Sequence, residues 1–118
     1  MSVKIKINYL EFQVKNIEEA KLFYGGSFGW TFEDYGPDYC AFNDGETDGG
    51  FYTSDLSSKT STGGVLVVLY SKDLESTRDV ITRNGGKIVK EIFSFPGGRR
   101  FHFTDPSGNE LAVWSDTE

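Results

Sequence analysis

The chain opens with an alternation of apolar and polar residues that runs from Val3 to Val14. A period of two is typical of a β-strand with one apolar and one polar face. Val3, Ile5 and Ile7 open this predicted strand, which continues to Val14. Further along, Leu10, Phe12 and Val14 share one parity, whereas Tyr9, Glu11 and Gln13 share the other. The pattern therefore predicts a strand that presents Tyr9, Glu11 and Gln13 together on one surface.

A helical pattern follows from about residue 17 to residue 24. Asn16 fits as its N-cap, and Glu19 stands three residues later, where a capping box places it. The apolar residues fall on one helical stripe, which holds Ile17, Ala20, Phe23 and Tyr24. Gly25 and Gly26 are expected to end the helix, because glycine adopts the left-handed C-cap conformation at little cost.

The same order of elements returns in the second half of the chain. Residues 64–71 contain the run VLVVLY, which predicts a strand that is buried on both faces. Asp73 takes the place of Asn16 as the cap of a second helix, from about Leu74 to Arg83, which Asn84-Gly85-Gly86 ends. We interpret this recurrence as an internal duplication of one supersecondary unit.

Shorter strands complete each unit. They are predicted at residues 28–35, 39–42 and 50–53 in the first unit and at 87–95, 100–104 and 109–114 in the second. Each unit then reads β-α-β-β-β, which predicts an α+β fold of two tandem modules: module 1 at about residues 1–54, a linker at 55–62 and module 2 at 63–118. A ferredoxin-like fold is the nearest alternative, but it has two strands between its helices, and four are counted here.

Composition narrows the classes of function. The 118 residues suit one domain, and the formal net charge of −6 argues against a nucleic-acid partner while remaining compatible with a cationic ligand. Cys40 is the only cysteine, so an intrachain disulfide is impossible and a reducing compartment is expected. Without a long apolar run or a signal-peptide pattern, we expect a cytoplasmic protein with no membrane partner.

Three motifs carry a resemblance to a known family. FYGGSFGW follows the first helix, NGGK follows the second, and DPSGNE precedes the last strand. In this order the chain resembles the vicinal oxygen chelate superfamily, which comprises glyoxalases, bleomycin-resistance proteins and ring-cleaving dioxygenases, and in particular its small bacterial glyoxalase-like members. The resemblance implies two modules whose mixed sheets curl around a cleft, and a homodimer.

The resemblance also implies where a divalent metal would be held. Family enzymes use His and Glu at four positions, which correspond here to Tyr9, Leu66, Gly49 and Ala112. None of these four is a usual metal ligand, so we expect neither the family's metal centre nor another cofactor. A carboxylate-only site that includes Glu11 and Glu110 is the alternative.

Parity assigns further residues to the cleft. Glu110 and Trp114 share parity with Ala112 and are expected to join Tyr9, Glu11 and Gln13 as ligand-binding residues, although Trp114 also suits a core cap or a dimer contact. Arg99 and Arg100 follow a Pro-Gly-Gly hinge and suit a lid that binds an anion, or a solvated loop.

Two candidates remain for catalysis. Glu11 can act as a base, and His102, the single histidine, can act as a general base or be a surface strand residue. Cys40 has no nearby cation to activate its thiol and is expected to be packed and inert.

The residues favour binding of a small, partly aromatic or cationic organic molecule without turnover, as in the bleomycin-resistance branch. The alternatives are a metal-dependent lyase, isomerase or dioxygenase of the glyoxalase type (lactoylglutathione lyase-like), and a dimeric module of a larger assembly.

Overall fold

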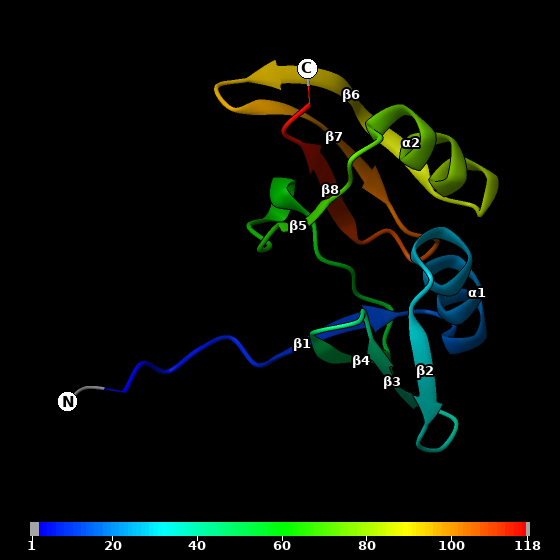
Figure 1. The fold of residues 1–118 in the computed structure, drawn as a ribbon. Coiled ribbons are helices and arrows are strands. Elements are labelled where there is room, and N and C mark those ends of the chain that lie inside the picture. The colour runs from blue at the N-terminus through cyan, green and yellow to red at the C-terminus, as the bar shows by residue number, and fades with distance from the viewer. Residues whose placement is uncertain (1–2, 118) are drawn as a thin grey trace.

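Two separate four-stranded sheets build the protein, here described from a computed structural model that covers residues 3–117 (Figure 1). The strand orders are β1-β4-β3-β2 and β5-β8-β7-β6, and in each sheet the first two strands of that order are parallel while the others pair antiparallel. The elements of module 1 are β1 Tyr9–Val14, α1 Ile17–Phe28, β2 Thr31–Asp34, β3 Tyr39–Asn43 and β4 Asp48–Thr53; those of module 2 are a short 3-10 turn Thr60–Thr62, β5 Val67–Tyr70, α2 Leu74–Arg83, β6 Lys87–Phe95, β7 Gly98–Thr104 and β8 Glu110–Ser115. The α+β fold of paired β-α-β-β-β units is thus confirmed.

One apolar core joins the two modules. Both helices lie on the same side of the molecule in Figure 1, and they contact each other. The apolar faces of the two sheets supply the other core residues, among them Phe12, Val14, Phe51, Phe101, Phe103, Leu111 and Val113. In β1 the residues of one parity, Phe12 and Val14, are buried in this core, whereas Tyr9 and Glu11 of the other parity are exposed.

The N-terminal ends of both helices are capped as predicted. Asn16 accepts a hydrogen bond from the backbone N–H of Glu19 (2.9 Å), and Asp73 accepts one from Ser76 (3.0 Å). The predicted end of α1 at Gly25 and Gly26 is wrong, because the helix continues to Phe28 and Gly29 forms the left-handed cap. Gly26 instead permits close helix contact, since a Cβ there would lie 2.3 Å from the side-chain oxygen of Asn84.

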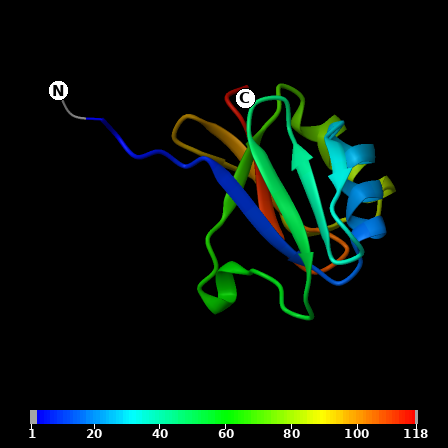
Figure 2. The ribbon, with the colours of Figure 1, turned by 90° about the horizontal axis from the view of Figure 1, so that it is seen from below.

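The first strand begins at Tyr9 and not at Val3, which corrects the prediction. Strand β4 starts at Asp48, opposite Tyr9, so residues 3–8 have no strand to pair with in the described part of the chain. Residues 3–8 form an extended arm that leads away from the body (Figure 2). Its apolar side chains are almost fully exposed: Val3 by 87%, Ile5 by 101% and Ile7 by 85%.

Strand β5 is not buried on both faces, which corrects a second prediction. Its alternate residues Val68 and Tyr70 are 42% and 49% exposed, because they point to the face of the sheet away from the core, whereas Val67 and Leu69 pack against the core. In the described part of the chain, α1 and α2 have 12 and 10 residues, too few to cross a membrane.

Candidate functional site

A cavity of about 250 Å³ lies between β1 and the strands β5 and β8. We call it the seam cavity, because it lies where the two modules meet. Three residues predicted to bind a ligand line it together: Glu11 and Gln13 from β1, and Glu110 from β8. Val65 and Val67 add an apolar wall. The shared parity of Glu11 and Gln13 therefore does place them at one cavity.

Tyr9 stands at the outer end of the same strand face, in a chain of hydrogen bonds. The hydroxyl of Tyr39 donates to the carboxylate of Glu11 (2.9 Å), and the hydroxyl of Tyr9 lies 2.6 Å from that of Tyr39. Gly50 leaves room for the Tyr39 ring, because a Cβ there would lie 2.1 Å from the Tyr39 hydroxyl oxygen. Burial, with the hydrogen bonds to Tyr9 and Glu11, raises the pKa of Tyr39, which stays a protonated donor.

Glu110 is paired with His102. This pairing was not predicted from the sequence. One oxygen of Glu110 lies 2.9 Å from Nδ1 of His102, and the other accepts from the backbone N–H and the hydroxyl of Thr60 at 2.9 and 2.8 Å. Burial alone would raise the pKa of Glu110, but these hydrogen bonds lower it below the ordinary value. His102 is buried, so it is not the surface strand residue of the alternative prediction.

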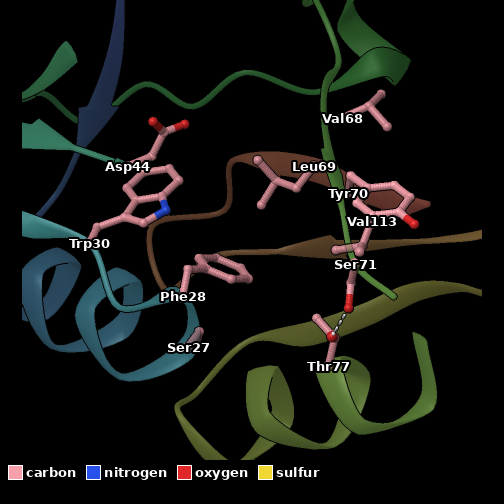
Figure 3. Close-up of a pocket in the computed structure, with 10 residues that line it drawn as sticks. All are labelled: Ser27, Phe28, Trp30, Asp44, Val68, Leu69, Tyr70, Ser71, Thr77 and Val113. Carbon is pink, nitrogen blue, oxygen red and sulfur yellow. Dashed lines mark hydrogen bonds between the residues drawn. The ribbon is translucent and has the colours of Figure 1, made fainter. Parts of the chain in front are cut away.

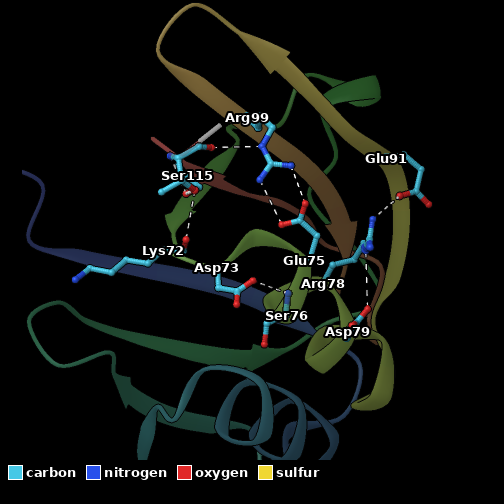
Figure 4. A network of polar contacts seen from close by, with 10 residues as sticks. Lys72, Asp73, Glu75, Ser76, Arg78, Asp79, Glu91, Arg99 and Ser115 are labelled. Atoms are coloured by element: carbon cyan, nitrogen blue, oxygen red, sulfur yellow. Dashed lines mark hydrogen bonds and ion pairs between the residues drawn. The ribbon is translucent and has the colours of Figure 1, made fainter.

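The remaining predicted residues lie apart from the seam cavity. Trp114 packs edge-on against Tyr70 at 5.2 Å between ring centroids and faces Arg100 across the β7–β8 ladder. Arg99 points to the helix side of the sheet, where its guanidinium binds both carboxylate oxygens of Glu75 at 2.8 and 3.3 Å (Figure 4). Arg99 and Arg100 lie on β7 and not on a loop, and the structure places them on opposite faces of that strand.

Buried polar contacts of the DPSGNE segment fix the shape of the seam. The Asp105 carboxylate accepts from the Tyr24 hydroxyl (2.7 Å) and from the backbone and side chain of Asn109. Asn109 in turn donates to the carbonyl of Gln13 (2.7 Å) and accepts from the N–H of Ser58 (2.8 Å). This segment therefore ties β1, the linker and β8 together around the cavity.

A second cavity of about 420 Å³ lies between the end of α1 and strand β5 (Figure 3). Phe28, Trp30 and Leu69 supply apolar walls, and the hydroxyls of Ser71 and Thr77 hydrogen-bond to each other (2.6 Å) at one end. None of the predicted ligand-binding residues lines it. We therefore regard the seam cavity as the candidate site.

The sequence did not predict the hydrogen-bond partners of Glu11 and Glu110. These partners are Tyr39, Thr60 and His102. Their pairing depends on strand order and on the path of the linker, which local patterns do not encode. Cys40 is fully buried, and burial raises the pKa of its thiol to about 11, in agreement with an inert role.

Comparison with known proteins identifies the family of this chain. The model of the Glyoxalase/Bleomycin resistance protein/Dioxygenase superfamily matches residues 6–113. None of the functionally curated proteins matches the chain significantly.

Similar solved structures include a glyoxalase-related enzyme from Fulvimarina pelagi (TM-score 0.78, 13% identity, 93% of this chain and 87% of that chain covered). An enzyme of the glyoxalase/bleomycin resistance protein/dioxygenase family from Burkholderia phytofirmans PsJN gives a TM-score of 0.77 at 14% identity, with 92% and 96% covered. An integron cassette protein of V. cholerae gives 0.69 at 18% identity, with 98% of both chains covered. The repeated modules, the fold and the family match together show that the chain belongs to the glyoxalase/bleomycin resistance protein/dioxygenase superfamily.

Proposed function

We propose that the protein binds a small organic molecule with a positively charged group in the seam cavity, without the family's His/Glu metal centre. The observation that carries the proposal is the convergence of Glu11, Gln13 and Glu110 at one cavity beside apolar Val65 and Val67. The residues that line this cavity include two carboxylates and no lysine or arginine. A cationic group is the charge that such a lining favours.

The residues at the positions where the family holds its metal support a metal-free site. Ala112 is fully buried and apolar, and Tyr9 is engaged with Tyr39. Gly49 lacks a side chain, and its Cβ direction points at the Phe42 ring in the core; Asp48 is the residue opposite Tyr9. Residues 3–117 contain no group of three His, Cys, Asp or Glu placed to hold a metal ion. One phenol and one carboxylate do not fit a first-row divalent metal.

The alternative function, an enzyme of the family, is favoured by one observation. His102 and Glu110 form a pair in which the carboxylate orients the imidazole, as in general-base sites. However, Nε2 of His102 is buried and makes no hydrogen bond within the described chain. A substrate would have to displace the side chains that cover it, so we rank binding first.

We expect benzyltrimethylammonium to raise the melting temperature of the protein, and Glu11→Gln to weaken its binding at least about fivefold. The physical reason is the loss of one charge at a partly desolvated contact, which costs about 1 kcal/mol. Thermal shift and calorimetry measure both effects. Glu33→Gln, an equal charge change on β2 of the same sheet as Glu11, is the control; equal losses in both variants would contradict the proposal.

We further propose that a second copy of the chain completes the assembly. In the described chain β1 and β5 each pair on one side only, and unpaired strand edges need a cover. The arm of residues 3–8 adds exposed Val3, Ile5 and Ile7 directly before β1. The arm also carries Lys4 and Lys6 and no acidic residue, which complements the acidic body of a partner copy.

Sedimentation is expected to give a homodimer at micromolar concentration. Ile5→Lys combined with Ile7→Lys should weaken dimerisation at least about tenfold, since each buried isoleucine is worth roughly 1.5–3 kcal/mol. Lys4→Ala with Lys6→Ala changes the other face of the arm and tests the contribution of charge. A monomeric wild-type protein at these concentrations would rule out this assembly.

A further inference from the structure

A hollow of about 400 Å³ lies at one end of sheet 2, where the β7–β8 turn meets the start of α1 and the linker. Lys15, Lys59 and Lys87 line it together with residues 105–108 of that turn. We call it the lysine hollow. It shares no lining residue with the seam cavity, and none of the residues predicted to bind a ligand lines it.

The three lysines come from three separate segments of the chain. Lys15 lies between β1 and α1, Lys59 directly precedes the 3-10 turn of the linker, and Lys87 is the first residue of β6. The fold thus brings three ammonium groups to one hollow of a protein whose net charge is −6. The charge of this hollow is opposite in sign to that of the whole molecule.

Backbone hydrogen bonds fix the segments that carry these lysines. The N–H of Lys15 donates to the hydroxyl of Ser107 (2.9 Å), and the carbonyl of Lys59 accepts from the N–H of Gly64 (2.8 Å). Lys87 is held in the β6–β7 ladder. A ligand in the hollow therefore has to order lysine side chains but no backbone, which lowers the entropic cost of binding.

The β7–β8 turn leaves room for the side chain of Lys59. Gly108 has a φ of +93°, which glycine adopts readily, and a Cβ there would lie 3.7 Å from Cε of Lys59 and 3.4 Å from Oγ of Ser57. The Lys59 side chain therefore runs along the turn. Its ammonium group, one bond beyond Cε, stays beside the hollow.

Carboxylates of the described chain do not neutralise the three lysines. Asp105 and Glu19 also line the hollow, but Asp105 accepts hydrogen bonds from Tyr24 and Asn109, and Glu19 takes part in no ion pair among residues 3–117. The side chains that do form the positive half of such pairs are those of Lys21, Arg78, Arg99 and His102. The repulsion between uncompensated like charges favours a bound anion.

We propose that the lysine hollow is a second ligand site, which binds the phosphate group of a small phosphorylated organic molecule. A phosphate ester carries most of a double negative charge at neutral pH, and lysine is a common partner of phosphate. The hydroxyls of Ser57 and Thr104 line the same hollow and add neutral donors. The enclosed volume suits a small molecule, whereas a nucleic acid needs a basic surface that extends further.

Calorimetry with glycerol 2-phosphate and with inorganic phosphate, at constant ionic strength, tests the proposal. We expect the wild type to bind both anions and not to bind glycerol, which lacks the charge. Lys59→Gln and Lys87→Gln should each weaken the binding of glycerol 2-phosphate at least about fivefold, because each removes one ammonium contact. Lys90→Gln on β6 and Lys72→Gln before α2 are matched controls, since neither lysine lines the hollow.

Lys59 and Lys87 are exposed, so both variants are expected to fold, which circular dichroism checks. Three outcomes would overturn the proposal. They are a wild type that does not bind glycerol 2-phosphate, binding that Lys59→Gln and Lys87→Gln leave unchanged, and an equal loss in Lys90→Gln. Tighter binding of a single-stranded oligonucleotide than of glycerol 2-phosphate would also contradict it, because the surface would then serve a macromolecule.

Two variants keep this proposal separate from that for the seam cavity. Glu11→Gln is expected to weaken the binding of benzyltrimethylammonium and to leave that of glycerol 2-phosphate unchanged. Lys59→Gln is expected to do the reverse. Failure at one site is therefore distinguishable from failure at the other.

Discussion

Asp105→Ala is expected to destabilise the protein by at least about 3 kcal/mol, because it leaves several buried donors without an acceptor. Asp105 is 4% exposed and accepts from Tyr24, from the N–H of Ser107, and from the backbone and side chain of Asn109. For a domain of this size the melting temperature should fall by about 12 °C. Chemical and thermal unfolding of the purified variant measure the effect.

Two milder variants keep this prediction testable if Asp105→Ala does not fold. Asp105→Asn retains an acceptor of the same shape and should lose less, whereas Tyr24→Phe removes one donor and should cost about 1 kcal/mol. Burial, followed by the neighbouring Asp105, raises the pKa of Tyr24, so its hydroxyl is a donor at neutral pH. If Asp105→Ala were as stable as Tyr24→Phe, the account of this network would be wrong.

Glu110→Ala is expected to cost about 2–3 kcal/mol at neutral pH, because the hydrogen bonds of Thr60 and His102 to a charged acceptor are lost together. The stabilisation should depend on pH. Because the folded-state pKa of Glu110 lies below the ordinary value of 4.5, the carboxylate contributes stability above that pH. The contribution is lost as the pH falls through the folded-state pKa.

Unfolding curves at pH 7 and at decreasing acidic pH check this dependence. The difference in stability between wild type and Glu110→Ala should shrink as the pH falls below about 4.5. Glu91→Ala, which changes an exposed glutamate on β6 of the same sheet, is the control and should show a small, nearly constant difference. If the difference in stability between wild type and Glu110→Ala grew as the pH falls, the direction of the pKa shift of Glu110 would be wrong.

Much of the fold could be predicted from the sequence, because local signals and packing agree. The bounds of α2 and β6 coincide with the predicted ones, and both N-caps are made as expected. The errors concern the ends of α1 and β1, which are determined by contacts with parts of the chain distant in sequence. Gly26 allows close contact with Asn84 and does not end the helix, and residues 3–8 have no partner strand among residues 3–117.

The candidate site was predictable only in part, for the same reason. Parity placed Glu11 and Gln13 on one face, and shared parity with Ala112 added Glu110. The pairing of Glu110 with His102 follows from the β7–β8 arrangement, and the contacts of Thr60 follow from the path of the linker. The resemblance implied a metal position at Gly49, whereas the β1–β4 register places Asp48 opposite Tyr9.

Binding of benzyltrimethylammonium with and without metal tests the central proposal most directly. Calorimetry is performed on protein treated with EDTA and dialysed, and on the same protein after addition of Zn²⁺, Mn²⁺, Ni²⁺ or Fe²⁺, with elemental analysis of each sample. We predict dissociation constants that agree within about twofold, since the proposed ligand contacts in the seam cavity come from two carboxylates and an amide. Binding that requires metal, together with retention of about one metal ion per chain, would contradict the proposal.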